Sequence, residues 1–206
     1  MADKIKVVAF LEDAGHEAFI PGLFFRLLRE QGVDSSKVDF MNLSSRGGKS
    51  LEAFEQFIKD TRNAPHLRGD LLIVGSDADS SGFQSRRKYI SEKSQQATYS
   101  KVVPVIPVPY IERWYLLDIR ALSSVSGLSL GQVSLSHPGD KHYYKTLLRK
   151  VLAENTPPLG GIEYGPDLVE KMDLYLARKQ DVGLDHFISE VTAWVKGNSE
   201  RFDSLG

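Results

Sequence analysis

Residues 71–75, LLIVG, form a run without a polar side chain, and two aspartates follow within four residues. A strand that is apolar on both faces must be covered on both faces, which is typical of a parallel sheet flanked by helices. Residues 5–11, IKVVAFL, form a second short run of mostly apolar, partly β-branched residues. These two runs predict the buried strands of one such sheet.

The rest of the N-terminal half alternates between the two periodicities. Further strands are predicted over 38–43 and 101–108, and helices over 16–31, 50–61 and 83–96. Strands that alternate with helices of this length indicate βαβ units. We therefore expect an α/β fold, a TOPRIM/Rossmann-like, mostly parallel sheet with helices on both faces.

The C-terminal third has a different pattern. Helices are predicted over 141–153, 166–177 and 184–195, with turns rich in Gly and Pro between them, such as NTPPLGG. We expect an α/β core over residues 1–118 and a helical extension over 119–206. The extension is expected to pack on the core as a single compact unit.

Composition excludes several kinds of site. The 206 residues include no cysteine, which removes disulfides, zinc–thiolate sites and thiol catalysis. The net charge of −1 is not that of a polycation that coats nucleic acid. A signal-peptide pattern and a bilayer-length apolar run are both absent, so we expect a cytoplasmic protein without a membrane partner.

Acidic residues follow three of the predicted strands. Asp77 and Asp79 come after residues 71–75, Glu12 follows the first strand with Glu17 a turn later, and Glu112 comes just after 101–108. Ligands of open parallel sheets bind beyond the carboxyl ends of the strands. We therefore expect these carboxylates to lie along one edge of the sheet, although they are far apart in the sequence.

Two interpretations of the aspartate pair are open. Aspartate and serine are favoured in turns, so the two aspartates of an isolated DxD can be there only to stabilise a turn. Alternatively, Asp77 and Asp79 occupy alternate positions of an extended segment, and both side chains can then project from the same side. Two close carboxylates repel each other, and a cation would relieve that repulsion. The gathering of acids at one edge favours the second interpretation, and an oxygen-rich site suits Mg²⁺ or Mn²⁺.

Two segments resemble motifs of TOPRIM domains, which occur in topoisomerases, primases and nucleases. FLEDAGHE, residues 10–17, resembles the first motif, and VGSDADSSG, residues 74–82, resembles the DxD motif. The chain is most similar to a bacterial TOPRIM-like group of unknown function, related to the overcoming-lysogenization-defect nucleases. In that group an E-x-W helix, here residues 112–114, and a short helical tail follow. The resemblance covers nearly the whole chain.

The resemblance implies roles for the acidic residues. Glu12 matches the first-motif acid, Asp77 and Asp79 match the metal-binding pair, Glu17 is the second acid of the first loop, and Glu112 is the additional acid of the group. One position departs from the pattern. Many relatives have glycine after the first acid, where this chain has Asp13 and then Gly15 two residues later.

Cations near these motifs are candidates for phosphate contacts. Arg86 and Arg87 follow the DxD, and Lys141 and Lys145 share one face of a predicted helix. Lys141 is a candidate for a catalytic lysine, and Arg86, Arg87 and Lys145 for nucleic-acid binding. The alternative interpretation is that such clusters are solvated faces.

The resulting expectation is a metal-dependent nuclease of the TOPRIM type. By resemblance, such proteins act in phage defence beside an ATPase partner. A non-catalytic metal-binding or regulatory subunit, or a metal-dependent phosphatase on a small ligand, are the alternatives. The choice between DNA and RNA and the oligomeric state do not follow from the sequence.

Overall fold

The computed structural model describes residues 4–44, 50–135 and 142–205. Its centre is a four-stranded sheet of β1 (Ile5–Leu11), β2 (Val38–Ser44), β3 (Leu71–Gly75) and β4 (Lys101–Val105). The strands lie in the order β2-β1-β3-β4, and every pairing is parallel. The prediction of a parallel α/β sheet is therefore confirmed.

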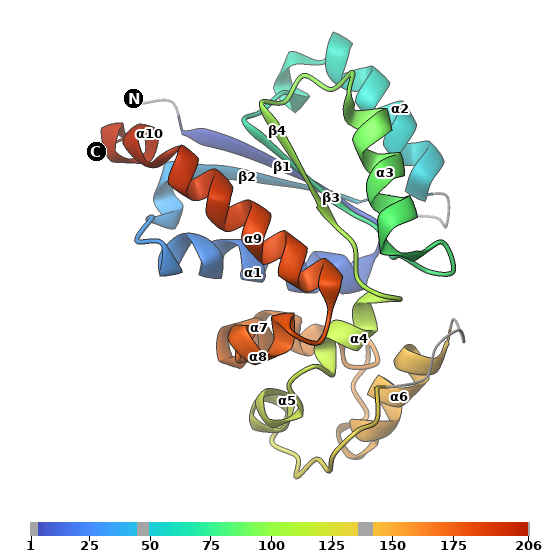
Figure 1. Ribbon diagram of the computed structural model, residues 1–206. Coiled ribbons are helices and arrows are strands. Elements are labelled where there is room, and N and C mark those ends of the chain that lie inside the picture. The colour runs from blue at the N-terminus through green and yellow to red at the C-terminus, as the bar shows by residue number, and fades with distance from the viewer. Residues whose placement is uncertain (1–3, 45–49, 136–141, 206) are drawn as a thin grey trace.

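Helices cover both faces of the sheet (Figure 1). Helices α1 (Ala14–Glu30) and α9 (Val182–Gly197) lie on one face, and α2 (Ser50–Asn63) and α3 (Gly82–Ser94) on the other. Successive β1 residues point to opposite faces, so that Val7 contributes to the first core and Val8 to the second. All five residues of β3 are buried, which explains the absence of polar side chains from that strand.

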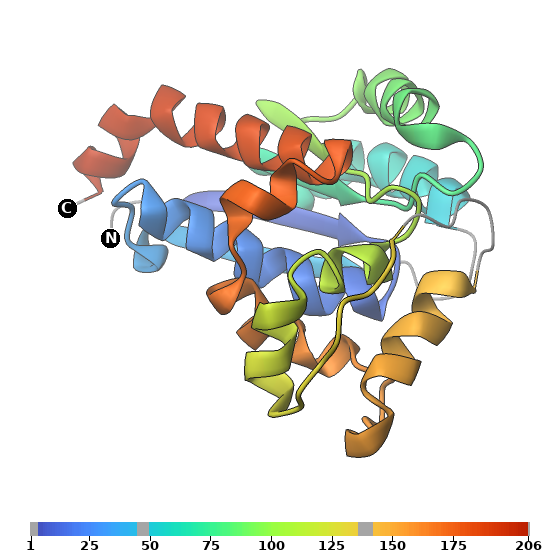
Figure 2. The ribbon, with the colours of Figure 1, turned by 60° about the horizontal axis from the view of Figure 1, so that its bottom comes forward.

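Short helices follow the end of β4 and lie beside the carboxyl ends of the strands (Figures 1 and 2). They are α4 (Ile111–Tyr115), α5 (Ile119–Ser126), α6 (Tyr143–Val151), α7 (Gly165–Lys171) and α8 (Leu174–Arg178), and α10 (Ser199–Ser204) follows α9. Turns of 3₁₀ helix lie at Ser35–Lys37, Pro65–Leu67, Ala153–Asn155 and Ile162–Tyr164. Helix α7 packs on α1, and α9 packs on β4. The C-terminal helical region thus lies against the α/β core, and the division at residue 118 stays a prediction.

Two predicted elements differ from the structure. The helix predicted over 166–177 is divided into α7 and α8, because the Asp173 side chain caps a new helix by accepting from the Leu176 N–H at 3.0 Å. The strand predicted over 101–108 ends at Val105. Pro107 and Pro109 follow, and proline has no N–H to donate to a ladder.

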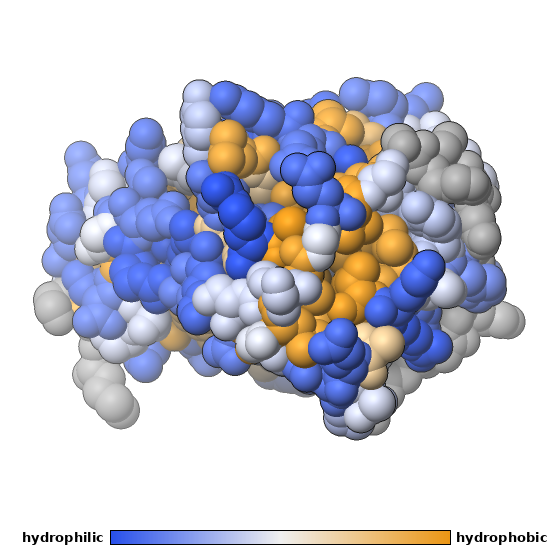
Figure 3. All heavy atoms as spheres, turned by 90° about the horizontal axis from the view of Figure 1, so that it is seen from below, coloured by the Kyte–Doolittle hydropathy of each residue, from blue (hydrophilic) through white to orange (hydrophobic). Residues whose placement is uncertain are grey.

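Buried and exposed apolar side chains are distributed unevenly. Trp114 and Tyr115 are fully buried and belong to the core. The face seen from below carries a broad group of hydrophobic residues among hydrophilic ones, on the side of the molecule where α5 and α6 lie (Figure 3). Within the described part of the chain, no helix combines the length and the apolar character needed to cross a bilayer.

Helix α9 begins in direct contact with the backbone after β4. A Cβ on Gly183 would lie 1.8 Å from the carbonyl oxygen of Ile106, so a side chain there forces the helix away. We expect Gly183→Ala to lower the free energy of unfolding in urea by about 1–3 kcal/mol or more. Gly197, in the same helix, is the matched control, since no described atom lies within 4 Å of a Cβ there. Gly197→Ala should leave the protein as stable or more stable by about 0.5–1 kcal/mol, and equal losses in both variants would contradict this account.

Candidate active site

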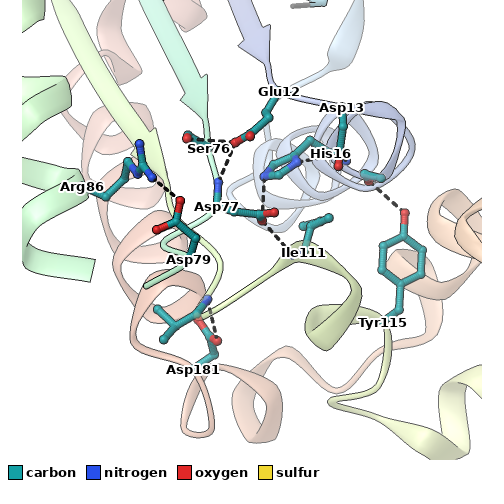
Figure 4. Close-up of polar contacts among 12 residues, drawn as sticks. Glu12, Asp13, His16, Ser76, Asp77, Asp79, Arg86, Ile111, Tyr115 and Asp181 are labelled. Carbon is teal, nitrogen blue, oxygen red and sulfur yellow. Dashed lines mark hydrogen bonds and ion pairs between the residues drawn. The ribbon is translucent and has the colours of Figure 1, made fainter. Parts of the chain in front are cut away.

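The loop after β3 is held by hydrogen bonds to the loop after β4. The N–H groups of Ser76, Ala78 and Asp79 donate to carbonyl oxygens of residues 105, 107 and 109, at 3.0, 2.9 and 3.0 Å. These bonds continue the β3–β4 pairing and fix the position of both aspartates. Asp79 has a φ of +43°, so the extended path ends there. The side chains of Asp77 and Asp79 consequently reach different partners (Figure 4).

Asp77 lies at the buried centre of the site. Its Oδ1 accepts from the Ile111 N–H at 2.8 Å, which joins the β3 end to the first residue of α4. The same oxygen lies 3.7 Å from His16 Nε2. Burial raises the pKa of the Asp77 carboxyl well above its usual value; the negative charges of Glu12, Asp13 and Glu112 raise it further, while the charge of His16 opposes both. The deepest acid of the site is therefore costly to ionise.

His16 is completely buried between two acids of the site. Asp13 caps α1, and its Oδ1 accepts from the His16 N–H at 3.0 Å and lies 2.9 Å from His16 Nδ1. Burial alone would lower the pKa of His16, but the hydrogen bond to Asp13 and the charges of Asp77, Asp13 and Glu12 raise it to about 9. Burial would raise the pKa of Asp13, but the bonds and charge of His16 lower it to about 2. A positive charge on buried His16, whose raised pKa keeps the ring protonated at neutral pH, thus offsets the charges of the surrounding acids.

Glu12 joins the ends of β1 and β3. Its Oε2 accepts from the Ser76 hydroxyl and from the Asp77 N–H, both at 2.9 Å. The two hydrogen bonds bring the first acidic motif against the DxD loop, as the order of parallel strands predicts.

Asp79 forms an ion pair with Arg86. Its Oδ2 accepts from the Arg86 guanidinium at 2.7 Å, and its Oδ1 accepts from the Ser81 N–H and hydroxyl at 2.9 and 2.8 Å. Arg86 is only 7% exposed, and its Nε has no hydrogen-bond partner among the described residues. The positive charge of Arg86 therefore compensates the negative charge of Asp79. A contact from Arg86 to phosphate stays a prediction.

Five carboxylates line one hollow of about 420 Å³, here called the acidic cavity. Its walls are Glu12, Asp13, Asp77, Asp79, Ser80, Tyr110, Glu112, His142 and Lys145. Burial raises the pKa of Glu112, the charge of Asp13 adds to this, and the charge of Lys145 opposes it. Four of the predicted acids and the predicted Lys145 thus come together from residues far apart in the sequence.

The other predicted site residues lie elsewhere. Glu17 is in the first turn of α1 and is not among the described residues that line the acidic cavity. Arg87 lines a separate cavity of about 400 Å³ between α3 and α9, with His186 and Glu190. Lys141 lies outside the described residues. The roles of all these residues stay predictions.

The donor set of the acidic cavity suits a hard divalent cation. Its ligands would be carboxylate oxygens with no sulfur, the set that Mg²⁺ and Mn²⁺ prefer. Among the described residues, however, no group of three or more His, Asp or Glu side chains is already arranged to hold a metal ion. Glu12 and Asp79 are instead engaged with protein donors. The chemistry of the residues fits such a cation, and binding would require these side chains to turn.

Comparison with known proteins places the chain in one family. The model of DUF4276, a domain of unknown function, matches residues 11–192. The chain belongs to this family. The DUF4276 match includes Glu12, Asp77, Asp79 and Glu112, and therefore spans every predicted acid of the cavity. No curated protein and no solved structure matches the chain.

Sequence reasoning missed the polar partners of these acids. The pattern of strands and acidic residues does not point to His16 or to Ser76. The spacing of His16 three residues after Asp13 is a local signal for a cap. No signal in the sequence indicates that the far side of the ring faces Asp77.

Proposed function

We propose that this protein is a divalent-metal-dependent phosphodiesterase of the TOPRIM type that cleaves nucleic acid. The observation that carries the proposal is the convergence of five carboxylates from three strand ends on one cavity, with Lys145 on its wall. Acids at the carboxyl ends of parallel strands are where such a fold holds its ligands. The TOPRIM-like motifs of the sequence support the same proposal.

Glu12, Asp77, Asp79 and Glu112 would hold Mg²⁺ or Mn²⁺. When bound, the cation supplies activation of water and neutralises charge on phosphate oxygens. His16 would keep Asp77 oriented from behind, because its buried ring lies 3.7 Å from Asp77 Oδ1. Lys145 is exposed and faces the cavity, so it would contact a phosphate of the substrate. An ATPase partner and a role in phage defence belong to the same proposal and rest on the resemblance alone.

A specific observation favours a second candidate, a non-catalytic metal-binding or regulatory subunit. Arg86 occupies an oxygen of Asp79, and no group of three acidic or histidine side chains among the described residues is ready to hold metal. A partner that turns Asp79 away from Arg86 would then complete the site. This candidate predicts no cleavage by the isolated chain.

Incubation with labelled DNA and RNA, with Mn²⁺ or with a chelator, tests the proposal. We expect cleavage that requires Mn²⁺. We also expect the logarithm of the binding constant to fall linearly with the logarithm of the salt concentration, with a slope of about −0.9 for each phosphate contact on a duplex. Lys145→Ala should flatten that slope by about one unit. Lys196→Ala, an exposed lysine of α9 outside the cavity walls, is the matched control and should leave it unchanged. Cleavage that persists in chelator, or affinity that ignores salt, would contradict the proposal.

A further inference from the structure

A second cavity, of about 580 Å³, adjoins the acidic cavity. Asp79, Ser80 and Tyr110 form walls of both. We call this second hollow the neutral cavity. Because the two cavities share these walls, one ligand can occupy both, with one chemical group in each.

The neutral cavity has an apolar lining with ring surfaces. Val108 and Pro109 come from the loop after β4, and Leu135 comes from the segment after α5. Tyr144 of α6 and Val182, the first residue of α9, complete the apolar walls. Tyr110 adds a second aromatic ring at the border with the acidic cavity. Apolar walls with a few fixed polar groups are typical of sites for small flat ligands.

The polar groups of the neutral cavity compensate one another. Arg113 donates to Asp181 at 2.6 Å and to the Gln180 carbonyl at 2.8 Å, and the Asp181 side chain is fully buried. Asp181, labelled in Figure 4, also accepts from the Val108 N–H at 3.3 Å. The guanidinium is thus held in one plane, and its charge is offset by Asp181. The cavity therefore suits an uncharged planar group rather than a phosphate, and a planar guanidinium can stack on such a group.

We propose that the neutral cavity binds one unpaired nucleobase, next to a phosphate that lies in the acidic cavity. The inference rests on the proposed function and specifies its substrate as single-stranded nucleic acid. A base in a duplex must be unpaired and unstacked before it can enter such a pocket. Aromatic and guanidinium surfaces bind bases of any sequence, because every base has a π-face.

Binding of short single strands and of the matched duplexes tests this assignment. Each strand carries one 2-aminopurine, and Ca²⁺ replaces Mn²⁺ to slow cleavage. We expect the wild-type protein to bind DNA or RNA single strands at least about 10-fold more tightly than the duplex, as base stacking in the cavity requires. The fluorescence of 2-aminopurine should change on binding of the single strand.

Two tryptophan variants locate the effect. Val182 lines the cavity and is 51% exposed, so Val182→Trp fills the hollow without entering the core. We expect it to weaken single-strand binding about 5- to 100-fold, the usual effect of losing one stacked base. Val182→Trp should change neither the affinity for the duplex nor the thermal stabilisation by Mn²⁺. Leu176→Trp adds the same side chain at a 43% exposed position that does not line the cavity, and should leave single-strand binding unchanged.

The outcomes separate this inference from the proposed function. Equal affinity for single strands and duplexes, with no effect of Val182→Trp, would overturn the base site and leave the phosphodiesterase proposal standing. Unchanged 2-aminopurine fluorescence in the wild-type complex would overturn it without reference to any variant. Stabilisation by Mn²⁺ without binding of any nucleic acid would overturn both proposals.

Discussion

Asp77→Asn is expected to abolish metal-dependent cleavage, with a loss of more than about 100-fold, since even partners of metal ligands cost 10- to 100-fold when removed. The metal-free variant should nevertheless be as stable as the wild type or more stable. Asparagine keeps an oxygen that accepts from the Ile111 N–H, and it removes a carboxylate whose ionisation burial opposes. Chelator-treated protein should therefore melt at the same or a higher temperature.

Thermal melts with and without Mn²⁺ measure how much the bound cation stabilises the wild type and the variant. A cation that binds only the folded state adds about 2.7 kcal/mol at a hundredfold excess over its Kd. We expect Mn²⁺ to stabilise the wild type and the control variant Asp203→Asn, whose substituted residue is exposed on α10. Asp77→Asn should not be stabilised. Asp77→Ala should be less stable than Asp77→Asn by about 1–3 kcal/mol, because the Ile111 N–H then loses its acceptor. Equal stabilisation of Asp77→Asn and wild type by Mn²⁺ would remove Asp77 from the metal site.

Arg113→Ala is expected to lower the free energy of unfolding by about 3–5 kcal/mol, the usual effect of leaving a buried charge unpaired. Arg113 is the ion-pair partner of Asp181, whose side chain is fully buried. Asp181 also accepts from the Val108 N–H and from the N–H groups of Gly183 and Leu184, and the last two bonds tie the carboxylate to the start of α9. Losing the arginine thus disturbs the contact between α4 and α9 as well as the neutral cavity.

Urea unfolding measures this loss, and Arg178→Ala is its control. Arg178 pairs with Asp185 at 2.5 Å, but both side chains are partly exposed, at 32% and 51%. Exposed pairs contribute about 1 kcal/mol or less, so Arg178→Ala should change the free energy of unfolding by no more than that. Equal losses in the two arginine variants would show that burial of Asp181 does not set the cost.

The parallel sheet was predictable because its signals are local. The apolar run of β3 requires cover on both faces, and the alternation of strands and helices requires parallel crossovers. The gathering of Glu12, Asp77, Asp79 and Glu112 also follows from the sequence, since parallel strands end at one edge of the sheet. The break between α7 and α8 was less predictable, because it depends on the hydrogen bond of a single capping side chain, Asp173.

By itself, the sequence determined the fold class, the edge at which the acids lie and the absence of cysteine ligands. Only the tertiary structure decided that Arg86 pairs with Asp79, that His16 faces Asp77 and that Ser76 donates to Glu12. It also decided that Arg113 and Asp181 meet beside a neutral cavity. Periodicity reports which face of an element is buried, because that depends on residues a few positions apart. Contacts between side chains of distant segments depend on how whole elements pack, and no local pattern carries that information.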